Sequence, residues 1–263
     1  MKVQINKNKS IGKVLYIIEG STTEPNLLHK LFTDIFDYQV EMNVRGKGYH
    51  KYNSKINPYS QVFVLNAENS NIKYIAKDNE FLNNLFVELV ETYGFDVDNS
   101  AIFYLFDRDR QSNTDSALIE TLLETLTNSR DNPNYYRQGL LLLSYPAIES
   151  FVLSNFTDNS FTFQIDTGKN LKRYLHEHKI DQSKITEETL MHAAKELMNA
   201  FSVMGVTDYD LDNFGVTNRA VYDYSEAAYA KEKLYHCLSL LCVSLLDLGL
   251  IEVENEIGID KEV

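Results

Sequence analysis

Five carboxylates stand at or just beyond the ends of short apolar runs in this chain: Glu19, Glu24, Asp107, Asp109 and Glu149. Glu19 directly follows the run KVLYII at 13–18, and Asp107 opens the sequence DRDR after the run AIFYLF at 101–106. Short apolar runs of this kind are typical of strands that are buried on both faces. The pattern therefore indicates acids placed at one edge of a buried sheet.

Acids at the ends of parallel strands predict a particular chemistry. In an open α/β sheet, ligands bind outside the carboxyl ends of the strands, so acids that are distant in sequence can converge there. Mg²⁺ prefers oxygen ligands and usually takes one or two carboxylates. Asp107 and Asp109 are two residues apart on an extended segment, so we expect both to point the same way and serve one ion. Two ions about 4 Å apart would assist cleavage of a phosphodiester.

Each acid also has a purely structural interpretation. Glu24 would favour the amino terminus of a helix, whose dipole attracts acids. The DRDR segment could be a solvated turn with local ion pairs, and Glu149 could form a structural pair. Glu19 is the hardest to explain by packing, because an acid followed by Gly20 is a poor end for an apolar strand unless a tight turn is needed there.

A sheet that positions these acids is predicted by apolar runs that alternate with amphipathic helical patterns. Strands are expected at residues 13–18, 61–65, 101–106 and 140–143. Helices are expected at residues 25–36, 81–93 and 115–127. Alternating strands and helices favour an α/β fold, with a mostly parallel, Rossmann-like sheet flanked by helices.

The strand signal fades after residue 155. Helices are expected at residues 186–201, 222–236 and 233–250, the last two as one continuous helix. The sequence therefore predicts two parts, an α/β domain at 1–155 that carries the acids and a mainly helical appendage at 156–263. Cys237 and Cys242 lie in an apolar stretch and are expected to be reduced core residues, in agreement with a reducing compartment.

Charge and hydropathy restrict the partners. The 263-residue chain has a formal net charge of −13 and a pI near 4.9. Proteins that bind nucleic acid through a broad electrostatic surface are basic, so any nucleic-acid contact here must be local, carried by metal ions or delivered by a partner. No apolar run reaches the ~18 residues needed to cross a bilayer, and Met1 to Gly12 is polar. We expect a cytoplasmic protein without a membrane partner.

One segment is basic and aromatic. The sequence RGKGYHKYNSKINPY at 45–59 contains no acid and carries four cations: Arg45, Lys47, Lys51 and Lys55. Lys and Arg side chains contact nucleic-acid phosphates, and aromatic rings stack on exposed bases. We predict that these four residues bind nucleic acid, with an ordinary solvated loop as the alternative.

The acidic motifs resemble a known family. The sequence EGSTTE after one strand and FDRDR after a later strand is similar to the TOPRIM domain of topoisomerases, primases and the overcoming-lysogenization-defect (OLD) nucleases. The spacing EG-x-x-TE and the later SYPAIESFVL are most similar to the RloB-like and AriB-like branches of bacterial antiphage defence proteins. The resemblance covers about residues 13–155 and does not extend to the segment that follows.

The resemblance implies roles for the five acids. Glu19 would be a general acid/base or a metal ligand, and Asp107 and Asp109 would hold Mg²⁺ or Mn²⁺. Glu24 and Glu149 match acids that nuclease branches use for a second ion. The implied activity is metal-dependent endonuclease cleavage in antiphage defence, with RNA such as tRNA slightly favoured over DNA.

Two other functions stay open. The resemblance to AriB-like proteins implies a partner subunit that an ATPase sensor holds inactive, with the negative charge serving to dock on a basic surface. The chain itself has no phosphate-binding loop of the Walker type. It could also be a TOPRIM module that binds nucleotide or nucleic acid without turnover. Metal-dependent cleavage by the purified protein alone would separate these hypotheses. The sequence leaves open the oligomeric state, a homo-oligomer included.

Overall fold

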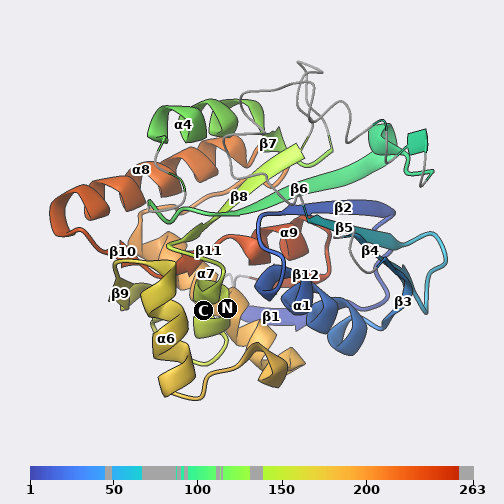
Figure 1. Ribbon diagram of the computed structural model, residues 1–263, viewed down its shortest axis with the longest axis horizontal. Coiled ribbons are helices and arrows are strands. Elements are labelled where there is room, and N and C mark those ends of the chain that lie inside the picture. The colour runs from blue at the N-terminus through green and yellow to red at the C-terminus, as the bar shows by residue number, and fades with distance from the viewer. Residues whose placement is uncertain are drawn as a thin grey trace, which may run out of the picture.

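A computed structural model gives the fold of the chain (Figure 1). The structure describes these residues: 1–44, 49–66, 87, 90, 91, 94–110, 113, 115–130 and 139–254. Most of the helix expected at 81–93 lies outside the described residues, as do Arg45 and Lys47.

The centre of the molecule is a mixed, mostly parallel sheet in the order β11-β8-β6-β2-β5-β4-β3. Its four parallel strands are β2 (Lys13–Ile18), β5 (Gln61–Asn66), β6 (Ser100–Asp107) and β8 (Gly139–Tyr145). These are the four strands predicted from the apolar runs. The antiparallel strands are β3 (Tyr38–Val44), β4 (Tyr49–Ser54), β7 (Thr127–Asn128) and β11 (Leu238–Ser239).

The strand order reverses between β2 and β6. From β2 the chain moves to β5 on one side, and it then returns to form β6 on the other side of β2. Ligands of open α/β sheets bind in the crevice outside such a reversal, at the carboxyl ends of the strands. The fold therefore places Glu19, which follows β2, and Asp107, which ends β6, beside this crevice.

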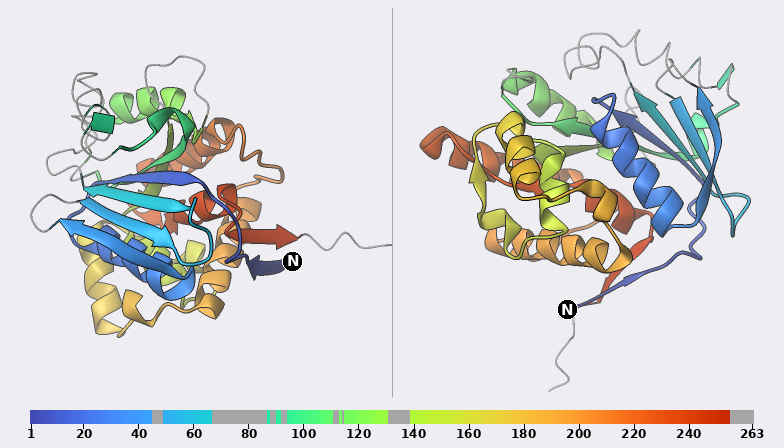
Figure 2. Two further views of the ribbon diagram at one scale, coloured as in Figure 1. Left: turned by 90° about the vertical axis from the view of Figure 1, so that its right-hand side faces the viewer. Right: turned by 60° about the horizontal axis from the view of Figure 1, so that its bottom comes forward.

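Helices flank both faces of the sheet, so the parallel strands are buried on both sides, as their continuous apolar sequences require (Figures 1 and 2). The helices are α1 (Thr23–Lys30), which continues as a π-helical turn (Leu31–Ile35), α4 (Ser116–Thr125), α5 (Glu149–Ser154), α6 (Gly168–Glu177), α7 (Glu187–Val203), α8 (Gly215–Glu232) and α9 (Leu241–Asp247). Single 3-10 turns occupy Val97–Asn99, Ser160–Thr162 and Gln182–Lys184.

The second half of the chain packs into the same core as the first. Strand β11 extends the central sheet, β12 (Ile251–Glu254) pairs with β1 (Lys2–Ile5), and β9 (Gln164–Ile165) pairs with β10 (Tyr235–His236). The Tyr16 hydroxyl of β2 lies 3.0 Å from the Ser244 hydroxyl of α9. One hydrophobic cluster contains residues from both sides of position 155. Packing therefore does not break at the expected boundary.

The second half differs from the prediction in one helix and agrees with it in its two cysteines. The continuous helix expected across 222–250 is wrong, because β10 and β11 separate α8 from α9 and pair with β9 and β8. Cys237 and Cys242 are buried and free, as expected. No described helix has the length and apolar character needed to cross a membrane.

Candidate active site

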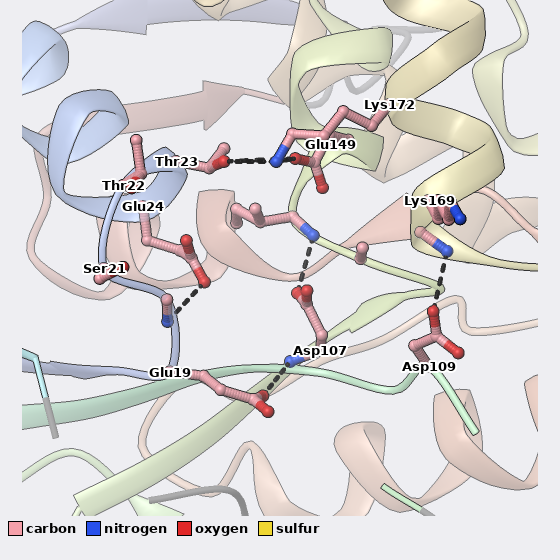
Figure 3. A pocket seen from close by; sticks show the side chains of 14 residues that line it. Glu19, Ser21, Thr22, Thr23, Glu24, Asp107, Asp109, Glu149, Lys169 and Lys172 are labelled. Carbon is pink, nitrogen blue, oxygen red and sulfur yellow. Dashed lines mark hydrogen bonds and ion pairs between the residues drawn. The ribbon is translucent and has the colours of Figure 1, made fainter. Parts of the chain in front are cut away.

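All five predicted acids line one cleft of about 520 Å³ at the carboxyl ends of β2, β6 and β8 (Figure 3). Side chains of α1, α5 and α6 complete its wall. The lining residues are Glu19, Gly20, Ser21, Thr22, Thr23, Glu24, Asp107, Asp109, Ala147, Ile148, Glu149, Gly168, Lys169 and Lys172. The convergence expected from the strand ends is present in the fold.

Gly20 explains the sequence that follows β2. Its backbone N–H donates a hydrogen bond to the Glu24 carboxylate at 2.9 Å, which folds this side chain back over the turn. A Cβ atom at position 20 would overlap that same carboxylate. The glycine is therefore needed for the close approach of Glu24, rather than for an unusual backbone angle.

Glu19 joins the ends of two neighbouring strands. Its carboxylate accepts a hydrogen bond from the Asp107 backbone N–H at 3.2 Å and lies 3.4 Å from the Asn113 side-chain amide. The same amide donates to the Asp107 carbonyl at 2.7 Å. Asn113 positions Glu19 against β6, and the sequence analysis missed it because a lone asparagine after DRDR carries no recognisable motif.

The two aspartates face different backbone donors. The Asp107 carboxylate accepts from the Ile148 N–H at 2.8 Å, and the Asp109 carboxylate accepts from the Gly168 N–H at 3.0 Å, at the start of α6. The expectation that both carboxylates point to one ion is not met by this arrangement. Among the described residues, no group of three or more histidines, cysteines or acids has the spacing of a formed metal site.

The donor set nevertheless suits a hard divalent ion. The lining offers five carboxylates together with the hydroxyls of Ser21, Thr22 and Thr23. Oxygen donors of this kind are those that Mg²⁺ and Mn²⁺ take in proteins. Glu19, Glu24, Asp107 and Glu149 would need only side-chain rotation to turn toward a cation in the cleft, because each already lines it.

Burial and mutual repulsion perturb these acids. Burial raises the pKa of Glu19 to about 7 and also raises the pKa of Glu24. Burial, followed by repulsion from Glu24, Glu149 and Glu19, raises the pKa of Asp107 well above its usual range. Ionising all of these groups is costly in the protein alone, and a bound cation would remove that cost.

Glu149 is held by a lysine that the sequence analysis did not select. Glu149 begins α5 and is 7% exposed. Lys172 of α6 places its Nζ 3.3 Å from the Glu149 carboxylate and 3.2 Å from the Thr23 hydroxyl. Only the fold brings α6 to the cleft, so the available signal was the cationic helix start GKNLKR at 168–173, which we had assigned to the appendage.

The arginines of DRDR point away from the cleft. Arg108 is fully buried, and its guanidinium Nε lies 2.8 Å from the carboxylate of Glu226 on α8. Arg110 also pairs with Glu226, and the Tyr235 hydroxyl donates a hydrogen bond to the Glu226 carboxylate at 3.2 Å. The alternative of a solvated turn with local ion pairs is therefore wrong, because the partner is more than a hundred residues away.

The basic segment at 45–59 is not a loop along its whole length, because residues 49–54 form β4 between β3 and β5. Lys51 pairs with Glu41 at 2.7 Å across the strands. Lys55 follows the end of β4 that pairs with the start of β5. It therefore lies at the amino-terminal end of the parallel strands, whereas the acids lie at the carboxyl end. The two described cations of the segment therefore do not line the acidic cleft.

Comparison with known proteins gives no match to a family model, a curated protein or a solved structure. What can be said about function therefore depends on the fold and the site. Both define an open α/β protein with an acidic cleft at the reversal of its strand order, the place where ligands bind in such sheets.

Proposed function

We propose that this chain is a Mg²⁺- or Mn²⁺-dependent nuclease that hydrolyses phosphodiester bonds in nucleic acid. The observation that carries the proposal is the convergence of five acids, from four separate parts of the chain, in one cleft at the strand-order reversal. A structural role for each acid alone does not explain why all five share one cleft. The motif resemblance to TOPRIM nucleases supports the same conclusion.

The acids divide into two groups by position. Asp107 ends β6 beside Glu19 and would hold one divalent ion, which Asp109 would join by leaving the Gly168 N–H; Glu19 would then stay free for proton transfer. Glu24 and Glu149 come from α1 and α5 on the other side of the cleft and would hold a second. The ions would supply Lewis-acid polarisation of the phosphate when bound.

Glu19 is the group best suited to proton transfer. Its pKa of about 7 places the carboxyl close to neutrality, where a general acid/base is most effective. Asn113 and the Asp107 N–H fix its orientation without consuming its second oxygen. Glu19 would take a proton from the attacking water and return it during turnover.

The resemblance to RloB-like and AriB-like proteins favours an effector of antiphage defence. Among nucleic acids, RNA such as tRNA is our first choice of substrate and DNA the second. The net charge of −13 supports a restricted target, since it leaves little surface for a long duplex.

The test is incubation of the purified chain with total tRNA, plasmid and single-stranded DNA, with Mg²⁺, with Mn²⁺ and with chelator. We expect metal-dependent cleavage of at least one substrate, and its loss in Asp107→Asn. Cleavage that appears only after addition of an ATPase partner would favour the regulated-subunit hypothesis. Tight binding without cleavage under all conditions would contradict the nuclease proposal and favour a binding module.

A further inference from the structure

A second cleft, of about 450 Å³, continues from the acidic one. Three residues, Thr23, Glu149 and Lys172, line both clefts. The second cleft runs along α6 and ends at the 3-10 turn Gln182–Lys184. A ligand whose reacting bond lies at the acids can therefore extend along α6.

Four lysines and one histidine follow one another along this path. Lys169, Lys172 and His176 are spaced by three and four residues, so they lie on one face of α6 and span about 10 Å. Lys179 and Lys184 continue the row beyond the helix, and both line the second cleft. All five side chains are exposed.

This row is a local exception in an acidic protein. Residues 168–184 contain five lysines or arginines against two acids, whereas the whole chain has a net charge of −13. Lys172, with 66% of its side chain exposed, stands where the two clefts meet and has already reached Glu149. The positive charge therefore begins at the acids and leads away from them in one direction.

The floor of the second cleft is apolar. Val152, Leu175 and Ile180 line it beside the neutral side chains of Thr23 and Gln182, and Glu149 and Asp181 are its two acids. An apolar floor beside a single row of cations suits one extended polynucleotide strand, whose phosphates meet the cations and whose bases and sugars cover the floor. A duplex would present a second charged backbone, for which this groove has no second row among the described residues.

We propose that the α6 groove, defined as the second cleft together with Lys169, binds a single strand of nucleic acid whose scissile phosphate lies at the five acids. This inference rests on the proposed nuclease function and names its substrate class, RNA or DNA in single-stranded form. Of the two described cations of the segment at 45–59, Lys55 lies at the amino-terminal end of the parallel strands and Lys51 does not line either cleft, so neither would contact a strand bound in the groove.

The groove can be tested with two double variants of equal charge. Lys179→Gln/Lys184→Gln removes two exposed cations from the far part of the groove, and Lys51→Gln/Lys55→Gln removes two from β4 and its end. Affinity for single-stranded RNA and DNA oligonucleotides is measured at several salt concentrations, with Ca²⁺ in place of Mg²⁺. We expect the log-log salt slope of the groove variant to flatten by about 1.4, at ~0.7 for each lost contact, and that of the control to match wild type.

Equal salt slopes for Lys179→Gln/Lys184→Gln and the wild type would overturn the inference. A slope that flattens only in Lys51→Gln/Lys55→Gln would overturn it as well. Duplex binding that is as tight as single-strand binding would also contradict it. Hydrolysis of bis(p-nitrophenyl) phosphate by the wild type tests the nuclease proposal separately, because that small diester cannot reach from the acids to Lys179. If the wild type cleaves this diester while the salt slopes are equal, the nuclease proposal is supported and the groove proposal is wrong.

Discussion

The sequence DRDR lies between two regions that differ in their buried charge, the acidic cleft on one side and the packing against α8 on the other. Its aspartates face the cleft, where burial and the neighbouring acids raise the pKa of Asp107, and both carboxylates accept hydrogen bonds from backbone N–H groups. Its arginines face α8, where both pair with the single carboxylate of Glu226. Alternate residues of an extended segment point to opposite sides. The protein therefore pairs its charges internally on the α8 side and leaves a surplus of acids on the cleft side.

The structural side should be the more sensitive to mutation. Glu226→Ala would leave the fully buried Arg108 without its carboxylate, and we expect a loss of about 3–5 kcal/mol in the free energy of unfolding. Asp223→Ala on the same helix removes an exposed pair with Arg219 and should cost about 0.5 kcal/mol or less. Chemical denaturation measures both, and equal effects would contradict the contrast.

The cleft side should lose function instead. Glu19→Gln keeps the size of the side chain and a hydrogen-bond acceptor for the Asp107 N–H, but it removes the negative charge and the proton acceptor. We expect cleavage to fall by at least ~100-fold with little change in fold. The cleavage rate of the folded variant is the measurement, with circular dichroism as the control. Wild-type activity would show that Glu19 is structural.

Gly20 lies in the cleft, but its substitution should change stability. Gly20→Ala would displace the Glu24 carboxylate and break its hydrogen bond with the Gly20 N–H; because the displaced atoms end a flexible side chain, we expect a stability loss of only about 1 kcal/mol. In a Glu24→Ala background the same substitution should cost much less, because the overlapping group is gone. A double-mutant cycle measures the coupling between the two positions. If the stability losses of Gly20→Ala and Glu24→Ala are additive, the close approach of the Glu24 carboxylate to Gly20 does not contribute to stability.

The acids should also make stability fall with pH. The pKa of Glu19 rises from 4.5 to about 7 on folding, so the folded chain holds more protons than the unfolded chain between these values. Stability without metal should therefore decrease as the pH rises from about 5 to about 8 and then level off. Mn²⁺ should raise the melting temperature more at the upper end of this range, where the acids are ionised.

Glu19→Gln isolates this contribution. The difference in melting temperature between wild type and variant should move in favour of the variant as the pH rises, because the variant has no carboxylate to ionise at this position. A difference that stays constant with pH would show that Glu19 ionises as easily in the folded chain as in the unfolded one.

The parallel strands and the acids at their ends were predictable for one physical reason. Strands buried on both faces require continuous apolar sequence, so β2 and β8 are visible in it, and their carboxyl ends follow directly. β3 and β4 were missed because YQVEMNV and YHKYNS mix polar and apolar residues, as strands in antiparallel pairing do. Their pairing is decided by the neighbouring strands rather than by their own sequence.

The part of the site that α6 contributes could not be predicted from the sequence, for a different reason. Gly168 and Lys172 belong to α6, which no strand signal connects to the cleft. They reach the acids only because α6 packs against α5. Likewise, β10 and β11 are two residues long each and exist through pairing with β9 and β8, which periodicity cannot reveal. Local patterns therefore identified the acids but not the cations that face them.

The central claim is that the cleft acids bind divalent ions, and calorimetric titration of the purified chain with Mn²⁺ tests it most directly. We expect one or two ions to bind to the wild type near neutral pH, and binding to disappear in Asp107→Asn/Asp109→Asn while the fold is kept. The exposed pair Asp208→Asn/Asp210→Asn is the matched control, and its Mn²⁺ binding should equal that of the wild type. Unchanged Mn²⁺ affinity in Asp107→Asn/Asp109→Asn would contradict the account.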